Sequence, residues 1–233
     1  MSKLVYALSK DGKSYKMVGM KRIPEDEDIL EIPEKHDGLP VVEIGKDAFE
    51  NGLWTYEGKI SKLHNIKKVI LPDGLKIIGK YAFMDCIDLK EIVIPDSVTK
   101  IDKGAFINCC SLETIKFSKK MKEISDHTCC RCSSLKQVEI PDNIKIIGKW
   151  AFTGDSAMTG FPGGAEKFRA KSTVISIPAS VIKIGKIAFA NFTDLTINVY
   201  GHKNKPSEWD DDWCHDPYSN INIRGSVKVN WNC

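Results

Sequence analysis

Apolar residues recur along the chain at a fixed distance, and this recurrence predicts a repetitive fold. Each copy of the pattern contains an isoleucine, followed by a short turn, and ends at a closing residue that is phenylalanine in five copies and cysteine in one. The closing residues are Phe49, Phe83, Phe106, Cys129, Phe152 and Phe189. From Phe83 to Phe152 they are 23 residues apart, and the two outer gaps are 34 and 37 residues. A constant period of this size is typical of a solenoid, in which each repeat buries its apolar side against its neighbours.

Within each repeat the apolar positions predict one short β-strand. Leu89, Ile92 and Ile94 define a spacing that two later copies reproduce, and alternation at its end is typical of a strand with one buried face. A proline follows this strand in four repeats, at Pro72, Pro95, Pro141 and Pro178. Proline ends the strand because it has no backbone N–H to donate. Stacked repeats therefore predict a parallel sheet and a continuous spine of phenylalanine rings.

The two ends of the chain depart from the repeat and predict caps. An N-terminal hairpin is expected from segments 4–8 and 14–18, which flank a turn containing Asp11 and Gly12. We assign residues 1–30 to this hairpin cap, 31–200 to six repeats and 201–233 to an irregular C-terminal cap. The tryptophans of the last segment are expected to pack within that cap, because the ends of a solenoid need a cover.

Two insertions interrupt the period at the same point, between the phenylalanine and the next strand. They add 11 residues within 50–65 and 14 within 153–171. Trp54 and Tyr56 lie in the first, and Phe161 and Phe168 lie in the second. Insertions at equivalent positions emerge from one edge of a solenoid, where binding faces often form. We hypothesise that the two loops frame a partner site; the alternative is that their aromatic rings pack within the loops.

The outward positions of the strands form a second candidate surface. Alternation places Lys68 and Glu91 in one column of this face, and Lys116 and Glu139 in the next. These four side chains, with the four insertion aromatics, are the predicted binding residues. The face is mixed in charge, so it predicts a contact surface without specifying a ligand.

Charge and hydropathy exclude two classes of partner. Lys and Arg total 34 against 31 Asp and Glu, a net charge of +3, which predicts no nucleic-acid partner. Apolar runs of about five residues are too short to span a membrane, so no membrane insertion is expected. The first residues are too quickly polar for a signal peptide. A cytoplasmic location is therefore the default, unless an export signal lies outside this sequence.

Eight cysteines indicate a disulfide framework until they are placed on the repeat. Cys86, Cys109 and Cys132 each stand three residues after the closing position, and Cys129 occupies that position. We expect reduced thiols that behave as small apolar groups, because side chains in register point side by side. The rival interpretation is a metal-binding or redox-sensing site within residues 109–132.

No arrangement of residues predicts catalysis. Residues 210–216 carry carboxylates, a thiol and an imidazole, but consecutive residues on a tail rarely converge on one point. The glycines stand singly, without a loop that would hold a phosphate. We therefore expect no catalytic residues, no cofactor and no metal, apart from the rival cysteine site.

Segments 89–98 and 105–109 resemble the BspA-like class of leucine-rich repeats. Residues 31–41 are similar to the lead-in repeat of that family, and 205–213 to its Pro-Ser-Gly-Trp-Asp ending, with Glu208 in place of glycine. The resemblance covers most of residues 4–214. It implies a leucine-rich-repeat horseshoe with parallel strands, used to contact protein or carbohydrate and often found on bacterial cell surfaces or secreted. The resemblance leaves the identity of the partner and the oligomeric state open.

Overall fold

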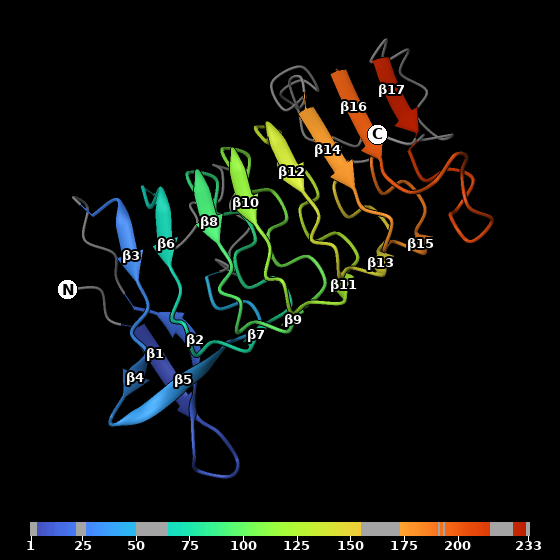
Figure 1. Ribbon diagram of the computed structural model, residues 1–233. Helices are drawn as coiled ribbons and strands as arrows, with labels where there is room; N and C mark the ends of the chain where they lie inside the picture. The colour runs from blue at the N-terminus through green and yellow to red at the C-terminus, as the bar shows by residue number, and fades with distance from the viewer. Residues whose placement is uncertain are drawn as a thin grey trace.

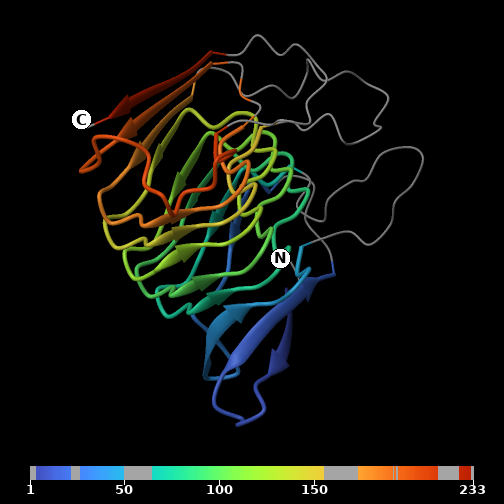
Figure 2. The ribbon, with the colours of Figure 1, turned by 90° about the vertical axis from the view of Figure 1, so that its right-hand side faces the viewer.

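The computed structural model describes residues 4–21, 27–49, 65–154, 173–190, 192, 194–214 and 226–231. All regular elements in these ranges are β-strands, and they stack in successive coils (Figures 1 and 2). Six coils between residues 29 and 184 each contribute one strand to a parallel sheet and a second short strand to the opposite side. The predicted repeat solenoid with parallel strands is thus confirmed, while its horseshoe curvature and the cap boundaries at residues 30 and 200 stay predictions.

Eight strands form the main sheet in the order β17-β16-β14-β12-β10-β8-β6-β3 (Figure 1). Their bounds are β3 (Ile29–Glu31), β6 (Lys68–Ile70), β8 (Glu91–Val93), β10 (Thr114–Lys116), β12 (Gln137–Glu139), β14 (Thr173–Ile177), β16 (Asp194–Val199) and β17 (Ser226–Trp231). All neighbouring pairs are parallel. In the three-residue strands the central side chain is buried and its two neighbours are exposed, as the alternation in the sequence predicts.

A second ladder of short strands runs along the other side of the coils. Its members are β5 (Leu39–Ile44), β7 (Ile77–Ile78), β9 (Lys100–Ile101), β11 (Glu123–Ile124), β13 (Ile146–Ile147) and β15 (Lys183–Ile184). The ladder divides between β9 and β11. There Ser125 stands where four other coils have glycine, and its hydroxyl donates to the Ile101 carbonyl at 2.6 Å.

The N-terminal segment forms the predicted hairpin. Strands β1 (Leu4–Leu8) and β2 (Tyr15–Met20) pair antiparallel, and the amide of Ser9 donates to the Ser14 carbonyl at 2.9 Å. Gly12 takes a φ of +67° in the turn, a conformation that costs glycine little. Strand β2 then pairs parallel with β5, and β4 (Lys35–His36) pairs antiparallel with β5. The hairpin therefore continues the second ladder.

The turns that follow the second ladder stack as well. The amides of Phe83, Phe106 and Phe152 donate to the next coil's carbonyls at Ala105, Thr128 and Ala188, over 2.8 to 2.9 Å. Except at the break between β9 and β11, neighbouring coils thus bond on three sides, which satisfies backbone groups that the core would otherwise leave unpaired.

Buried phenylalanine rings form the predicted spine. Ring centroids lie 5.0 Å apart for Phe49 and Phe83, 5.2 Å for Phe83 and Phe106, and 5.5 Å for Phe152 and Phe189. The two rings of each pair are stacked, so phenylalanines of successive coils lie face to face. The spine accounts for much of the apolar surface that one coil could not bury alone.

The coil with Cys129 replaces the spine phenylalanine by a smaller side chain. In the same coil Phe117 takes the position that isoleucine holds at Ile94 and Ile140, and its ring meets Phe152 edge-on at 6.1 Å. A large residue at the end of the strand therefore accompanies a small one in the turn. Because phenylalanine exceeds isoleucine by less than it exceeds cysteine, this exchange offsets part of the volume that the core loses at Cys129.

The predicted cysteine ladder lies in the core. Cys86, Cys109 and Cys132 are buried, and the Cys109 and Cys132 thiols donate to the Phe83 and Phe106 carbonyls at 3.2 Å each. All cysteines among the described residues are free thiols. These side chains therefore act as small apolar groups, and those of Cys109 and Cys132 also bond to the preceding coil.

Candidate binding surface

The register of the main sheet places the four predicted strand residues on one exposed face. Lys68 lies beside Glu91, Val93 beside Lys116, and Glu139 beside Ser176 on neighbouring strands. The Lys68 ammonium and the Glu91 carboxylate are 2.6 Å apart, and Gln137 donates to Glu139 at 3.0 Å. Exposed pairs of this kind add little to stability. Their main effect is to set an alternating pattern of charge on the face.

A hollow of about 900 Å³ opens on this face over β8, β10 and β12. The strand residues that line it include Glu91, Val93, Thr114, Lys116, Gln137 and Glu139. The turns after β10 and β12 form its end, through Phe117, Lys119, Pro141, Asp142 and Asn143. Its size falls within the range of small-molecule and peptide sites.

Hydrogen bonds between coils hold the end of the hollow in place. The Lys119 amide donates to the Asp96 carboxylate of the previous turn at 2.9 Å. Ser118, which replaces the usual proline, is buried and donates to the Val98 carbonyl at 2.6 Å. The loop therefore presents its side chains from a fixed backbone.

Apolar side chains are exposed along the first half of the same face. Val93 is 57% exposed and borders the hollow, and Ile70 on the next strand is 42% exposed. Ile70 and Val93 therefore form an apolar corner that is open to solvent. An exposed apolar group within a polar rim is typical of a contact surface.

A smaller polar pocket of about 380 Å³ lies at the opposite ends of the strands. Asp28 and Lys67 form an ion pair across it at 3.4 Å, and the Asn65 amide donates to the Asp88 carboxylate at 3.1 Å. The apolar pattern of the repeats does not predict this pocket. A usable signal was present, because Asn65 and Asp88 stand one 23-residue period apart.

The predicted insertion aromatics Trp54, Tyr56, Phe161 and Phe168 lie outside the described residues. The described chain resumes after the insertions at Asn65 and Thr173, and the strands β6 and β14 begin close by. Both insertions thus attach at the edge of the main sheet where its strands begin. The hypothesis that they frame a partner site stays a prediction.

The rival cysteine site finds little support in the geometry. Within the described ranges, no group of three or more His, Cys, Asp or Glu side chains is arranged to hold a metal ion. Burial raises the pKa of the Cys109 and Cys129 thiols well above the usual value. Neutral buried thiols are poor nucleophiles and poor ligands. Cys109 and Cys129 therefore suit a packing role better than a reactive one.

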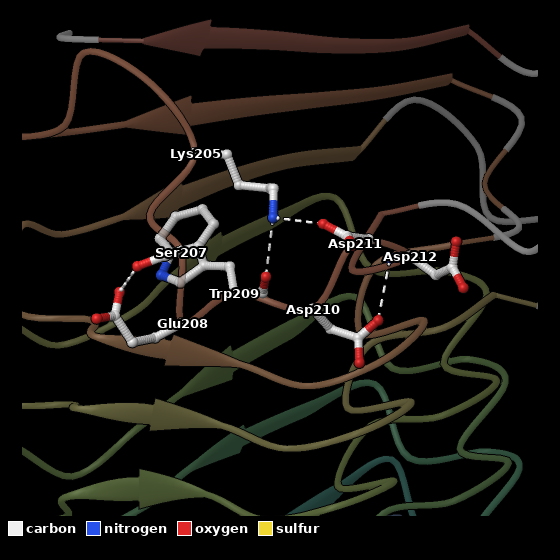
Figure 3. A network of polar contacts seen from close by, with 7 residues as sticks. All are labelled: Lys205, Ser207, Glu208, Trp209, Asp210, Asp211 and Asp212. Atoms are coloured by element: carbon white, nitrogen blue, oxygen red, sulfur yellow. Dashed lines mark hydrogen bonds and ion pairs between the residues drawn. The ribbon is translucent and has the colours of Figure 1, made fainter.

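The Asp210 and Asp211 carboxylates bind partners of their own segment (Figure 3). Lys205 donates to the Trp209 carbonyl at 2.9 Å and to the Asp211 carboxylate at 2.8 Å, which lowers the pKa of Asp211. The Asp212 amide donates to the Asp210 carboxylate at 3.0 Å. The rings of Trp209 and Trp213 are buried 5.0 Å apart. The tryptophans thus pack with one another, as expected, and Trp213 also meets Phe189 of the preceding coil edge-on at 5.8 Å.

Residues 58–162 match the family described as BspA type leucine rich repeat region, in six copies. The repeats of this region are BspA-type leucine-rich repeats. The spine and strand spacing of that region are the features described above. No curated protein matches the sequence.

Solved structures of bacterial leucine-rich repeat proteins resemble the chain. A leucine rich repeat protein of T. pallidum is 24% identical, with 84% of this chain and 82% of that chain covered and a TM-score of 0.62. One from Bacteroides ovatus is 20% identical, covering 100% and 70%, with a TM-score of 0.46. A leucine rich cell surface protein from Faecalibacterium prausnitzii is 16% identical, covering 99% and 94%, with a TM-score of 0.39. The first of these likenesses supports the fold.

BspA-type repeats suggest a protein-interaction module in general terms. Leucine-rich repeat proteins of this kind are generally binding modules rather than enzymes. Among the described residues, none belongs to a helix long and apolar enough to cross a membrane.

Proposed function

We propose that this chain is a non-enzymatic module that binds a protein partner through the exposed face of its main sheet. The observation that carries the proposal is the hollow over β8, β10 and β12, with the exposed Val93 at its border. Buried apolar anchors supply most of the binding energy of protein interfaces, and a polar rim supplies orientation. Val93 fits the first role, and Glu91, Lys116 and Glu139 fit the second.

The rigidity of the face favours this use. Each outward side chain stands on a strand that is bonded to both neighbours, so little backbone entropy is lost when a partner binds. Stacked repeats also give a continuous surface that is longer than any single coil. An extended protein segment could therefore contact several coils at once.

The two aromatic insertions are proposed to extend the site at its edge. They attach where the strands of the main sheet begin, so a partner that crosses the face reaches them without leaving the solenoid. A glycan partner held by these aromatics is the second form of the same proposal. The family resemblance adds a cell-surface or secreted location to the proposal.

Capture of partners from source-cell and host extracts tests the proposal with the full chain. Val93→Asp should abolish retention of a protein that the unaltered chain holds, because it places a charge at the apolar contact. Ile182→Asp is the matched control, since both side chains are 57% exposed and Ile182 lies beside the second ladder. Circular dichroism confirms that each variant folds.

A third variant separates the strand face from the insertions. In it, both insertions are shortened so that the period returns to 23 residues. Loss of the partner with the shortened loops but not with Val93→Asp would place the site on the insertions. If every variant retained the partner, neither the strand face nor the insertions would be the binding site.

A further inference from the structure

The side of the solenoid opposite the main sheet carries a column of lysines. They occupy one position in five coils, at Lys46, Lys80, Lys103, Lys149 and Lys186, with Asp126 in the remaining coil. Backbone bonds hold these turns together: the Tyr81 amide donates to the Lys103 carbonyl, and the Trp150 amide to the Lys186 carbonyl. Adjacent coils in such a stack are about 4.8 Å apart.

The second ladder adds more lysines beside this column. We define the lysine face as six equivalent segments, residues 42–47, 76–81, 99–104, 122–127, 145–150 and 182–187. They hold ten lysines and five carboxylates, an excess of positive charge larger than the +3 of the whole chain. Nine of the ten lysines are exposed, and Lys186 is half-buried. Charge that is balanced along the sequence is therefore segregated in space.

Several of these lysines are available for an anionic ligand. Ion pairs join Lys46 to Asp47, Lys100 to Asp102 and Lys186 to Asp212. Lys80, Lys103 and Lys149 form no ion pair within the described part of the chain. These three therefore give the column unneutralised positive charge.

An unusual row of side chains stands next to the lysine column. Asp47, Tyr81, His127, Trp150 and Ile187 all have φ between 54° and 58°, in the left-handed region that favours glycine. In the one remaining coil the equivalent residue is Gly104, with a φ of +68°. Glycine is therefore sufficient for this turn, yet three coils have an aromatic side chain at this position. Strained backbone that holds particular side chains is typical of functional sites.

The rings of this row lie at the surface beside the lysines. Tyr81, His127 and Trp150 are half-buried. The His127 and Trp150 rings are nearly parallel at 6.0 Å, and the Lys80 ammonium lies 4.8 Å from the centre of the Tyr81 ring. Burial lowers the pKa of His127, and Lys103 lowers it further despite Asp126, so this ring is neutral near pH 7. The three rings thus supply flat surfaces rather than charge.

We propose that the lysine face binds a linear anionic polysaccharide. The ammonium groups pair with its sulfate or carboxylate groups, and the rings of Tyr81 and Trp150 pack against the C–H faces of its sugars. A linear chain with regularly spaced anions matches a column of lysines that repeats with every coil. The six segments contain no arginine, the residue most used for nucleic-acid recognition, which favours a glycan over a nucleic acid. The proposal is independent of the protein site on the main sheet.

Binding of heparin to the full chain, measured at several salt concentrations, tests the charge component. The variant Lys80→Gln, Lys103→Gln, Lys149→Gln should bind about tenfold more weakly and with a shallower salt dependence. The control Lys67→Gln, Lys90→Gln, Lys136→Gln removes the same charge at the edge of the main sheet and should change affinity less than about twofold. Equal losses in both variants, or no binding of heparin by the unaltered chain, would overturn the proposal.

A second pair of measurements tests the ring component. Trp150→Gly should keep the fold, because Gly104 already occupies this turn in another coil. It should weaken heparin binding by about fivefold and leave binding of inorganic polyphosphate, which has no sugar ring, unchanged. Equal effects on the two ligands, or tighter binding of single-stranded DNA than of heparin, would contradict a polysaccharide site. Val93→Asp should leave heparin binding unchanged, which separates this site from the proposed protein site.

Discussion

At the scale of single residues, glycine decides how closely two coils approach. A Cβ atom at Gly148 would lie 2.5 Å from the Asp126 amide nitrogen, and one at Gly185 would lie 2.7 Å from the Lys149 nitrogen. Both contacts are with backbone, which cannot turn aside as a flexible side chain does. In these two coils the glycine that follows the second strand therefore permits a close approach to the preceding coil.

Replacing Gly148 by alanine should destabilise the fold. We expect Gly148→Ala to lower the free energy of unfolding by about 1–3 kcal/mol, since the coils must separate to admit the methyl group. Gly74→Ala is the matched control, because no atom lies within 4 Å of its added Cβ. Its effect should stay within about 0.5 kcal/mol. Urea unfolding followed by circular dichroism measures both, and equal losses would refute the close-approach explanation.

At the scale of the coil, a small side chain at one position is partly offset by a larger one at another. Cys129 takes a spine position that other coils fill with phenylalanine, and Phe117 supplies a ring from the strand end of the same coil. The coil that lacks the spine phenylalanine thus has another source of packing. Ser118 adds a hydrogen bond at the place of the missing proline.

Introducing at position 129 or 117 the residue that other coils carry should destabilise the fold, unless both positions are changed together. Cys129→Phe alone should cost about 1–3 kcal/mol by overpacking. Phe117→Ile alone should cost a similar amount by leaving a cavity. The double variant should be more stable than the sum of the two losses predicts, by about 0.5–3 kcal/mol of coupling energy. A double-mutant cycle of unfolding free energies measures this term, and strict additivity would show that the two side chains fill separate spaces.

At the scale of the whole molecule, cooperativity passes from coil to coil and is weakest where a ladder divides. The amides of Lys145 and Gly148 donate to the Lys122 and Ile124 carbonyls at 2.8 Å each. One coil earlier, the Ile101 carbonyl accepts the Ser125 hydroxyl instead. A solenoid is held by interfaces between neighbours, so local opening should begin at this junction.

Hydrogen exchange of the native chain measures this difference. The amides of Lys122 and Ser125 should exchange faster than those of Lys145 and Gly148 by about tenfold or more, because their coil lacks the equivalent backbone bonds. Ser125→Gly should slow exchange at both positions by allowing the ladder to close. Equal protection at the two junctions would show that the stack is uniformly cooperative.

Local pattern was enough to predict much of the fold. The strand positions, the phenylalanine spine and the cysteine ladder each repeat with the same period, and a residue's place in the period states which way it faces. The same reasoning placed Lys68, Glu91, Lys116 and Glu139 on the exposed face. It could not predict the hollow beside Val93, because its walls come from three coils and the turns that follow them.

The sequence by itself determined the coil, because each repeat carries its own strand, turn and apolar side and needs only a neighbour of the same kind. The tertiary structure alone decided which charged side chains share a face. Lys80, Lys103 and Lys149 are far apart in the chain and are offset there by acidic residues, but stacking brings them into one column. It also decided the left-handed backbone of Tyr81 and Trp150, since closing the coil imposes a turn that their own conformational preferences disfavour.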